Sequence, residues 1–221
     1  MPAATTDVGM WLEMGISETN SNSPPDLIKK WSQVISQRYS ESWRYYHILT
    51  HISDMMTHFG RWKERIKDKN AVILAILFHD IIYDPKSSTN EKDSIEVFKQ
   101  FSAETSIAPE LSDRVVQLIT ATITHQTDNN LQDTDMDFFL DFDMAVLGQP
   151  EKEYRAYAGA IRKEYSHVED RLYSSGRAQV LQTFLERPNI FATLPFREMF
   201  EAQARENLKQ EIEDLRLPAL S

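Results

Sequence analysis

Histidine and aspartate residues recur where the surrounding sequence is apolar. His79 and Asp80 directly follow the apolar run 71–78. Upstream, His47 and His51 are four residues apart, so on a helix they share one face. Imidazole and carboxylate groups grouped in this way are the side chains from which a protein builds a site for a divalent metal ion.

A second pair of acids lies further along the chain. Asp141 and Asp143 flank Phe142 in the segment FFLDFDMAVLG. This segment is apolar and predicted to be helical, so we expect it to lie in the core of the protein. Burying an ionised carboxylate without a partner is very costly. A metal ion is one partner that makes such burial tolerable, and neutral imidazole is the commonest nitrogen ligand of metals in proteins. The acids and histidines together therefore indicate a metal site.

The elements that must position these side chains are predicted to be helices. Glycine is scarce, with 6 residues, and no stretch alternates apolar and polar residues between hairpin turns. Apolar residues recur instead at helical spacing. Helices are expected over 26–38, 42–59, 71–82, about 88–101, 108–124, 136–147, 151–173, 177–186 and 195–215. Ser174-Ser175-Gly176 is expected to break the chain between the helices over 151–173 and 177–186.

Length and composition indicate one globular domain. The 221 residues suffice for a helical domain with a real core, and 41% hydrophobic and 26% charged residues are ordinary for a soluble protein. We expect residues 1–24 to form a poorly ordered leader, because SETNSNSPP lacks an apolar period, and residues 25–217 to form a single all-α domain.

Several classes of function are excluded or disfavoured. There is no cysteine, so disulfides, thiolate nucleophiles and Cys-based metal sites are excluded. The longest apolar run is far too short to span a membrane, and we expect a cytoplasmic protein. A net charge of −10 without a long Lys/Arg cluster disfavours nucleic acid as a partner.

The order of these motifs resembles that of a known family. The segments YHILTHI, ILAILFHDIIYD and FFLDFDMAVLG, in this order, resemble the HD superfamily of metal-dependent phosphohydrolases. The phrases NEKDS, LITATITHQ, YAGAIRKEY and GRAQVLQTFL are similar to a small bacterial branch of predicted HD-type phosphohydrolases. The resemblance covers roughly residues 25–215 and implies a helical bundle of HD type.

The resemblance implies four metal ligands: an upstream His, the His-Asp pair and a distant Asp. The pair corresponds to His79 and Asp80. For the upstream ligand we favour His51 over His47, because the family pattern has an apolar residue four positions after the ligand, and Met55 follows His51 in this way.

For the distant ligand we favour Asp143 over Asp141, because Asp143-Met144 resembles the usual Asp followed by a helical apolar stretch. Mixed histidine and carboxylate ligands suit one divalent transition metal (Mn, Fe, Zn, Co or Ni) better than calcium. A second metal, bridged by Asp80, would require His125 to reach the site.

Candidates for proton transfer lie just after the His-Asp pair. We favour Glu91 first and Asp84 second as the acid or base, and His125 as a phosphate contact or proton donor. His47 and Lys86 are the candidates for binding substrate. The three candidates for proton transfer each have a structural alternative: Asp84 before Pro85 is common in turns, Glu91 is common in helix caps, and His125 falls at a helix end.

The resemblance implies a metal-dependent phosphohydrolase acting on a small-molecule phosphate ester, of a nucleotide or a similar metabolite. The alternative is a regulatory protein that keeps the HD scaffold and binds metal or nucleotide without catalysis. An apolar stripe on the last predicted helix would permit a homodimer.

Overall fold

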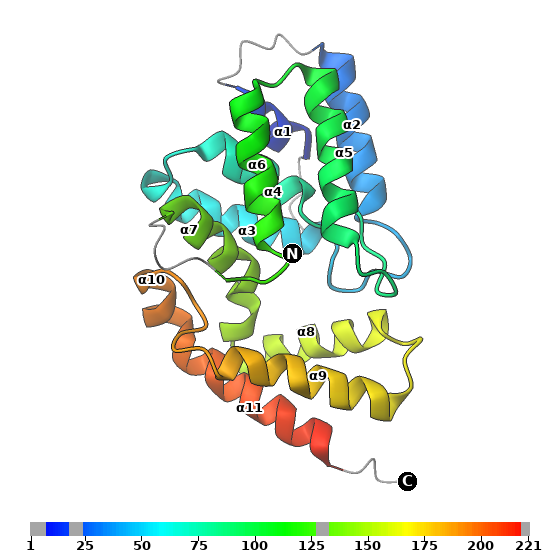
Figure 1. Cartoon of the computed structure of the whole chain (residues 1–221), viewed down its shortest axis with the longest axis vertical. Coiled ribbons are helices and arrows are strands. Elements are labelled where there is room, and N and C mark those ends of the chain that lie inside the picture. Colours follow the sequence, from blue (N-terminus) through cyan, green and yellow to red (C-terminus); the bar gives the residue numbers. More distant parts are fainter. Residues whose placement is uncertain (1–7, 18–23, 127–132, 218–221) are drawn as a thin grey trace. The chain divides into compact units, whose positions relative to one another are not determined.

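Figure 1 shows a computed structural model that describes residues 8–17, 24–126 and 133–217. All regular elements within these ranges are helical, which confirms the predicted all-α class. No helix among the described residues is long and apolar enough to cross a membrane. The chain divides into two compact units, residues 1–142 and 143–221, so the domain predicted over 25–217 spans both.

The first unit is built around one fully buried helix, α4 (Lys69–Phe78), whose residues from Asn70 to Phe78 are all buried. It packs against α1, α3, α5 and α6 (Figure 1). The elements of this unit are α1 (Val8–Ile16), α2 (Pro25–Arg38), α3 (Leu49–Trp62), the 3₁₀ turn η1 (Lys63–Arg65), α4, α5 (Asn90–Thr105), α6 (Pro109–Ala121) and α7 (Thr134–Met144), the last of which passes the boundary at Phe142.

Polar side chains fix where α4 begins. The carboxylate of Asp68 accepts a hydrogen bond from the backbone N–H of Ala71 at 2.9 Å, as an N-cap does. The buried carboxylate of Asp135 accepts hydrogen bonds from the N–H groups of Lys67 and Asp68, at 2.8 and 2.9 Å. The helix ends at Phe78, and His79 is its C-cap, so the His-Asp pair sits on the end of the best-packed element of the unit.

The second unit contains the 3₁₀ turn η2 (Ala145–Gly148), α8 (Glu151–Glu164), α9 (Asp170–Leu185), α10 (Leu194–Phe196), the π-helical turn η3 (Arg197–Glu201) and α11 (Ala202–Arg216). Helix α11 packs against α9 and η2. A polar cluster ties three helices together: Glu211 accepts hydrogen bonds from the Tyr154 hydroxyl and from Nε of Arg177, the latter at 2.8 Å.

The expectation of a poorly ordered leader over 1–24 is wrong for part of that segment. Residues Val8–Ile16 form α1, which packs against α2 and α4. Its Leu12 is fully buried and Trp11 and Ile16 nearly so, and this apolar face supplies the burial that stabilises a short helix. Residues 1–7 and 18–23 lie outside the described residues.

The helix predicted over 42–59 begins later than expected. Residues 40–48 form turns, and α3 starts only at Leu49 and continues through Gly60 to Trp62. The side chain of Arg44 turns inward and donates hydrogen bonds to carbonyls of another segment, an interaction that the helical periodicity of the sequence does not reveal. Gly60 is tolerated because one glycine lowers helix stability by only about 1 kcal/mol.

The prediction of one continuous helix over 151–173 is wrong. The helix breaks at residues 165–169, and α9 then continues through Ser174-Ser175-Gly176, where a break between helices was predicted. The carboxylate of Glu169 accepts a hydrogen bond from the N–H of Leu172 at 3.1 Å and so caps the new helix. The new helix therefore begins at a capping acid, and Gly176 lies within it.

Candidate metal centre

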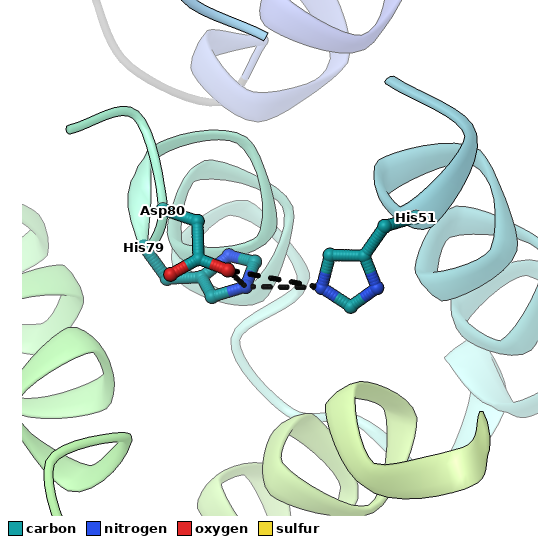
Figure 2. A group of neighbouring side chains, drawn as sticks. All are labelled: His51, His79 and Asp80. Atoms are coloured by element: carbon teal, nitrogen blue, oxygen red, sulfur yellow. Dashed lines mark hydrogen bonds and ion pairs between the residues drawn. The ribbon is translucent and has the colours of Figure 1, made fainter. Parts of the chain in front are cut away.

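Three of the predicted ligands come together at one point of the first unit. His51 projects from the first turn of α3, and His79 and Asp80 come from the C-terminal end of α4 (Figure 2). His51 and His79 are 3% and 1% exposed. The Asp80 side chain is 19% exposed and thus forms the solvent-facing edge of the group.

The spacing of the donor atoms fits a single small cation. Nε2 of His51 lies 3.3 Å from Nε2 of His79, and Oδ2 of Asp80 lies 3.1 Å from the His79 nitrogen and 4.0 Å from the His51 nitrogen. The point equidistant from these three atoms is about 2.1 Å from each of them, which is the bond length between zinc and nitrogen or carboxylate oxygen. One ion can therefore lie within bonding distance of all three donor atoms.

The protonation of His79 leaves a lone pair at this point. Its Nδ1 lies 3.0 Å from the carbonyl oxygen of Ile76, and a carbonyl only accepts, so Nδ1 carries the proton. In the neutral ring, Nε2 then presents its lone pair toward the Asp80 carboxylate oxygen. Two acceptors 3.1 Å apart repel each other unless a proton or a metal ion lies between them. The arrangement thus favours a cation.

A hydroxyl group lies within hydrogen-bonding distance of the second imidazole. The Tyr46 hydroxyl lies 3.1 Å from Nδ1 of His51 and can either donate to it or accept from it. When the hydroxyl accepts from a protonated Nδ1, Nε2 of His51 has its lone pair available for a metal. Hydrogen bonds of this kind fix the ring orientation and basicity of metal ligands.

His47 stands beside the group, outside the set of three. Its Nε2 is 3.9 Å from Oδ2 of Asp80, and its side chain is 19% exposed. Its ring stacks on that of Tyr83, with centroids 4.1 Å apart. Between the two histidines weighed as upstream ligand, the group of three thus contains His51, and His47 borders it on the exposed side next to Asp80.

Arg44 holds this part of the chain together. Its side chain is fully buried and donates hydrogen bonds to the carbonyl oxygens of His47, Asp80 and Ile81, at 3.1, 2.7 and 3.0 Å. It also pairs with the carboxylate of Glu41 at 3.0 Å. Its guanidinium donors are therefore directed at protein acceptors.

The two candidate acids differ in how they are held. Asp84 is exposed and accepts a hydrogen bond from the N–H of Lys86 at 2.9 Å, which is the turn role given above as its alternative. The side chain of Asn90 bonds both the N–H and the C=O of Asp84, so the start of this loop is fixed. Glu91 is half-buried in the first turn of α5, and Lys86 is exposed.

The remaining predicted residues do not belong to the group of three. His125 is half-exposed after α6, with a φ of 47° in the left-handed region. Asp141 is buried on α7 at 2% exposure. Asp143 is the first residue of the second unit, and its assignment as the fourth ligand stays a prediction. The roles of Glu91 and His125 likewise stay predictions.

Sequence reasoning missed two residues that support the site. Neither the hydroxyl of Tyr46 beside His51 nor the backbone hydrogen bonds of Arg44 follow from the sequence pattern. Asp54, three residues after His51 on α3, is exposed; desolvation by the surrounding protein raises the pKa of its carboxyl, and the charge of His51 opposes this. The adjacency of Arg44 and Tyr46 to the pair His47 and His51 was the signal in the sequence that could have singled them out.

The chain matches no family model, no curated protein and no solved structure. What the fold and the site define is therefore an all-helical chain with a three-donor group able to hold a metal ion.

Proposed function

We propose that this chain is a metal-dependent phosphohydrolase of HD type, acting on a phosphate ester of a nucleotide or a similar small metabolite. The observation that supports it best is the convergence of His51, His79 and Asp80 on one point at metal-bonding distance. The order of the motifs in the sequence supports the same proposal. One divalent transition metal is the cofactor in this proposal, because the donors are mixed nitrogen and oxygen.

When bound, such an ion lowers the pKa of a coordinated water and polarises a phosphoryl oxygen. The chain supplies the rest. His51 and His79 lie in the apolar interior, while Asp80 and His47 form the exposed side through which a phosphate ester would approach. In the proposal His47 and Lys86 contact the phosphate, and Glu91, or else Asp84, exchanges a proton with the reacting oxygen.

Metal analysis combined with an activity panel tests this proposal. The wild type is purified without added metal, analysed for bound ions, and assayed on nucleotides and generic mono- and diesters with Mn²⁺, Zn²⁺, Co²⁺ or Ni²⁺. His79→Ala and Asp80→Ala should lose the metal and the activity while keeping their helical content. His167→Ala, on an exposed residue of the second unit, serves as the matched histidine control.

Each outcome separates the alternatives. Metal binding with hydrolysis of an ester supports the enzyme. Metal binding without turnover of any ester supports the regulatory protein. Stoichiometric metal in both His79→Ala and Asp80→Ala would contradict the site itself.

A further inference from the structure

Arg44 borders the site, and its side chain is fully buried. Four of its five N–H groups are used in the hydrogen bonds to Glu41, His47, Asp80 and Ile81. Three of the acceptors are backbone carbonyls, which carry no net charge. A guanidinium used in this way, with a single carboxylate partner, binds protein backbone in a specific geometry, because its planar donors point in fixed directions.

The carbonyls bound by Arg44 belong to two segments far apart in the sequence. His47 lies in the turns before α3, and Asp80 and Ile81 lie in the turn after α4. The Nη1 atom of Arg44 donates to the carbonyl oxygens of both His47 and Asp80, so it links the two segments directly. The rings of Tyr39 and Tyr83 lie 5.1 and 5.5 Å from the guanidinium carbon and help to fix its plane.

We infer that Arg44 is a positioning residue of the metal centre, which sets the distance between the imidazole of His51 and the carboxylate of Asp80 by clamping the backbone of both segments. The inference rests on the proposed metal site. Its physical basis is that Asp80 contributes its carboxylate to the ion and its carbonyl to Arg44, so the clamp holds the ligand by its own backbone. The segment before α3 also carries Tyr46, the hydrogen-bond partner of His51.

Lysine cannot replace arginine in this role. An ammonium group is a single point with three donors, whereas the planar guanidinium reaches separate acceptors at fixed angles. Loss of a group that orients a metal ligand typically weakens metal affinity about 10- to 100-fold. We therefore expect Arg44→Lys to fold, to keep the charge and to bind Zn²⁺ or Co²⁺ about 10- to 100-fold more weakly.

The experiment compares the Zn²⁺ affinity and the visible spectrum of bound Co²⁺ in the wild type and three variants of the full chain. Arg44→Lys should show weak binding and an altered Co²⁺ spectrum. Arg114→Lys removes a bidentate pair with Asp133 elsewhere in the first unit, and should lower the melting temperature without changing either readout. Glu41→Gln removes the ion pair but leaves the three carbonyl bonds, and should bind metal with nearly wild-type affinity.

Several results would overturn the inference: wild-type affinity and spectrum in Arg44→Lys, an equal loss of affinity in Arg114→Lys or Glu41→Gln, or an Arg44→Lys protein that does not fold. The last would mean that Arg44 serves the whole unit and not the site. A wild type that binds metal but hydrolyses nothing would remove the hydrolase proposal and leave this one standing. A wild type that binds no metal would remove both.

Discussion

The ring nitrogens of His51 and His79 that face each other are 3.3 Å apart, although the two residues are 28 positions apart in the chain and come from different helices. Only one proton fits between two such nitrogens. A metal ion bound there would replace that proton and bring in Asp80 as a third ligand. The first two predictions below test this replacement.

A divalent ion should stabilise the chain, and its removal should destabilise it. An ion present at 100 times its dissociation constant adds about 2.7 kcal/mol to the free energy of unfolding. Calorimetry should therefore show a higher melting temperature with Zn²⁺ or Mn²⁺, reversed by a chelator. Ca²⁺ should have little effect, because it prefers more, purely oxygen ligands at longer distances. His51→Ala should melt at one temperature with and without Zn²⁺.

Tyr46→Phe should weaken metal binding with little loss of stability. The variant removes only the hydroxyl beside Nδ1 of His51, so we expect an affinity about 10- to 100-fold lower in calorimetric titration. Tyr45→Phe is the matched control, because Tyr45 is the neighbouring residue and is 48% exposed. Equal affinities in the two variants would show that the hydroxyl of Tyr46 has no part in the site.

Stability should fall on mild acidification through His58. Burial, and secondarily the charge of Arg61, lowers the pKa of His58 below its usual value of 6.5. The unfolded chain therefore takes up a proton at this residue before the folded chain does, and the free energy of unfolding falls as the pH drops below 6.5. Above that pH the residue contributes no pH dependence, because it is neutral in both states.

The measurement is chemical unfolding of the metal-free protein across this range. His58→Gln should reduce the slope of the free energy of unfolding against pH. Arg61→Gln should move the pKa of His58 upward in an NMR titration, because a cationic neighbour is removed. A slope that is unchanged in His58→Gln would assign the pH dependence to other groups.

Gly148→Ala should destabilise the second unit. A β-carbon at Gly148 would meet the backbone of Phe200, 2.7 Å from its carbonyl oxygen, and backbone cannot move aside as a side chain can. We expect a loss of about 1–3 kcal/mol in the free energy of unfolding, as for other overpacked sites. The loss should appear in denaturant unfolding.

Gly159→Ala is the matched control for that substitution. Gly159 lies within α8, and a β-carbon there would meet nothing within 4 Å. Alanine in a helix interior is favoured over glycine by about 0.5–1 kcal/mol, so this variant should gain stability. If both variants lost stability, the contact with Phe200 would not be the cause.

The local part of the site was predictable from the sequence. An apolar run that ends in His79-Asp80 predicts a buried helix with ligands at its end, and α4 has this form. The spacing of His47 and His51 predicts a shared helix, but His47 lies one residue before the N-cap of α3. The periodicity of the sequence did not locate the start of that helix.

What the sequence could not predict are contacts between distant segments. Arg44 bonds carbonyls 36 and 37 residues away, and a backbone acceptor leaves no trace in residue type. Helix α1 was missed because its apolar residues are followed at once by a polar, proline-containing stretch, and its burial depends on α4. Tertiary packing decided both cases, as it commonly overrides local propensity.

Gly15 of α1 approaches α4 so closely that a β-carbon there would lie 2.9 Å from the side chain of Leu74. Helix α1 thus covers one side of α4, the helix that ends at the histidine-aspartate pair. A truncated protein that starts at Met14 would lack Trp11 and Leu12 and would expose apolar side chains of α4. Poor solubility of such a shortened protein would then say nothing about its chemistry.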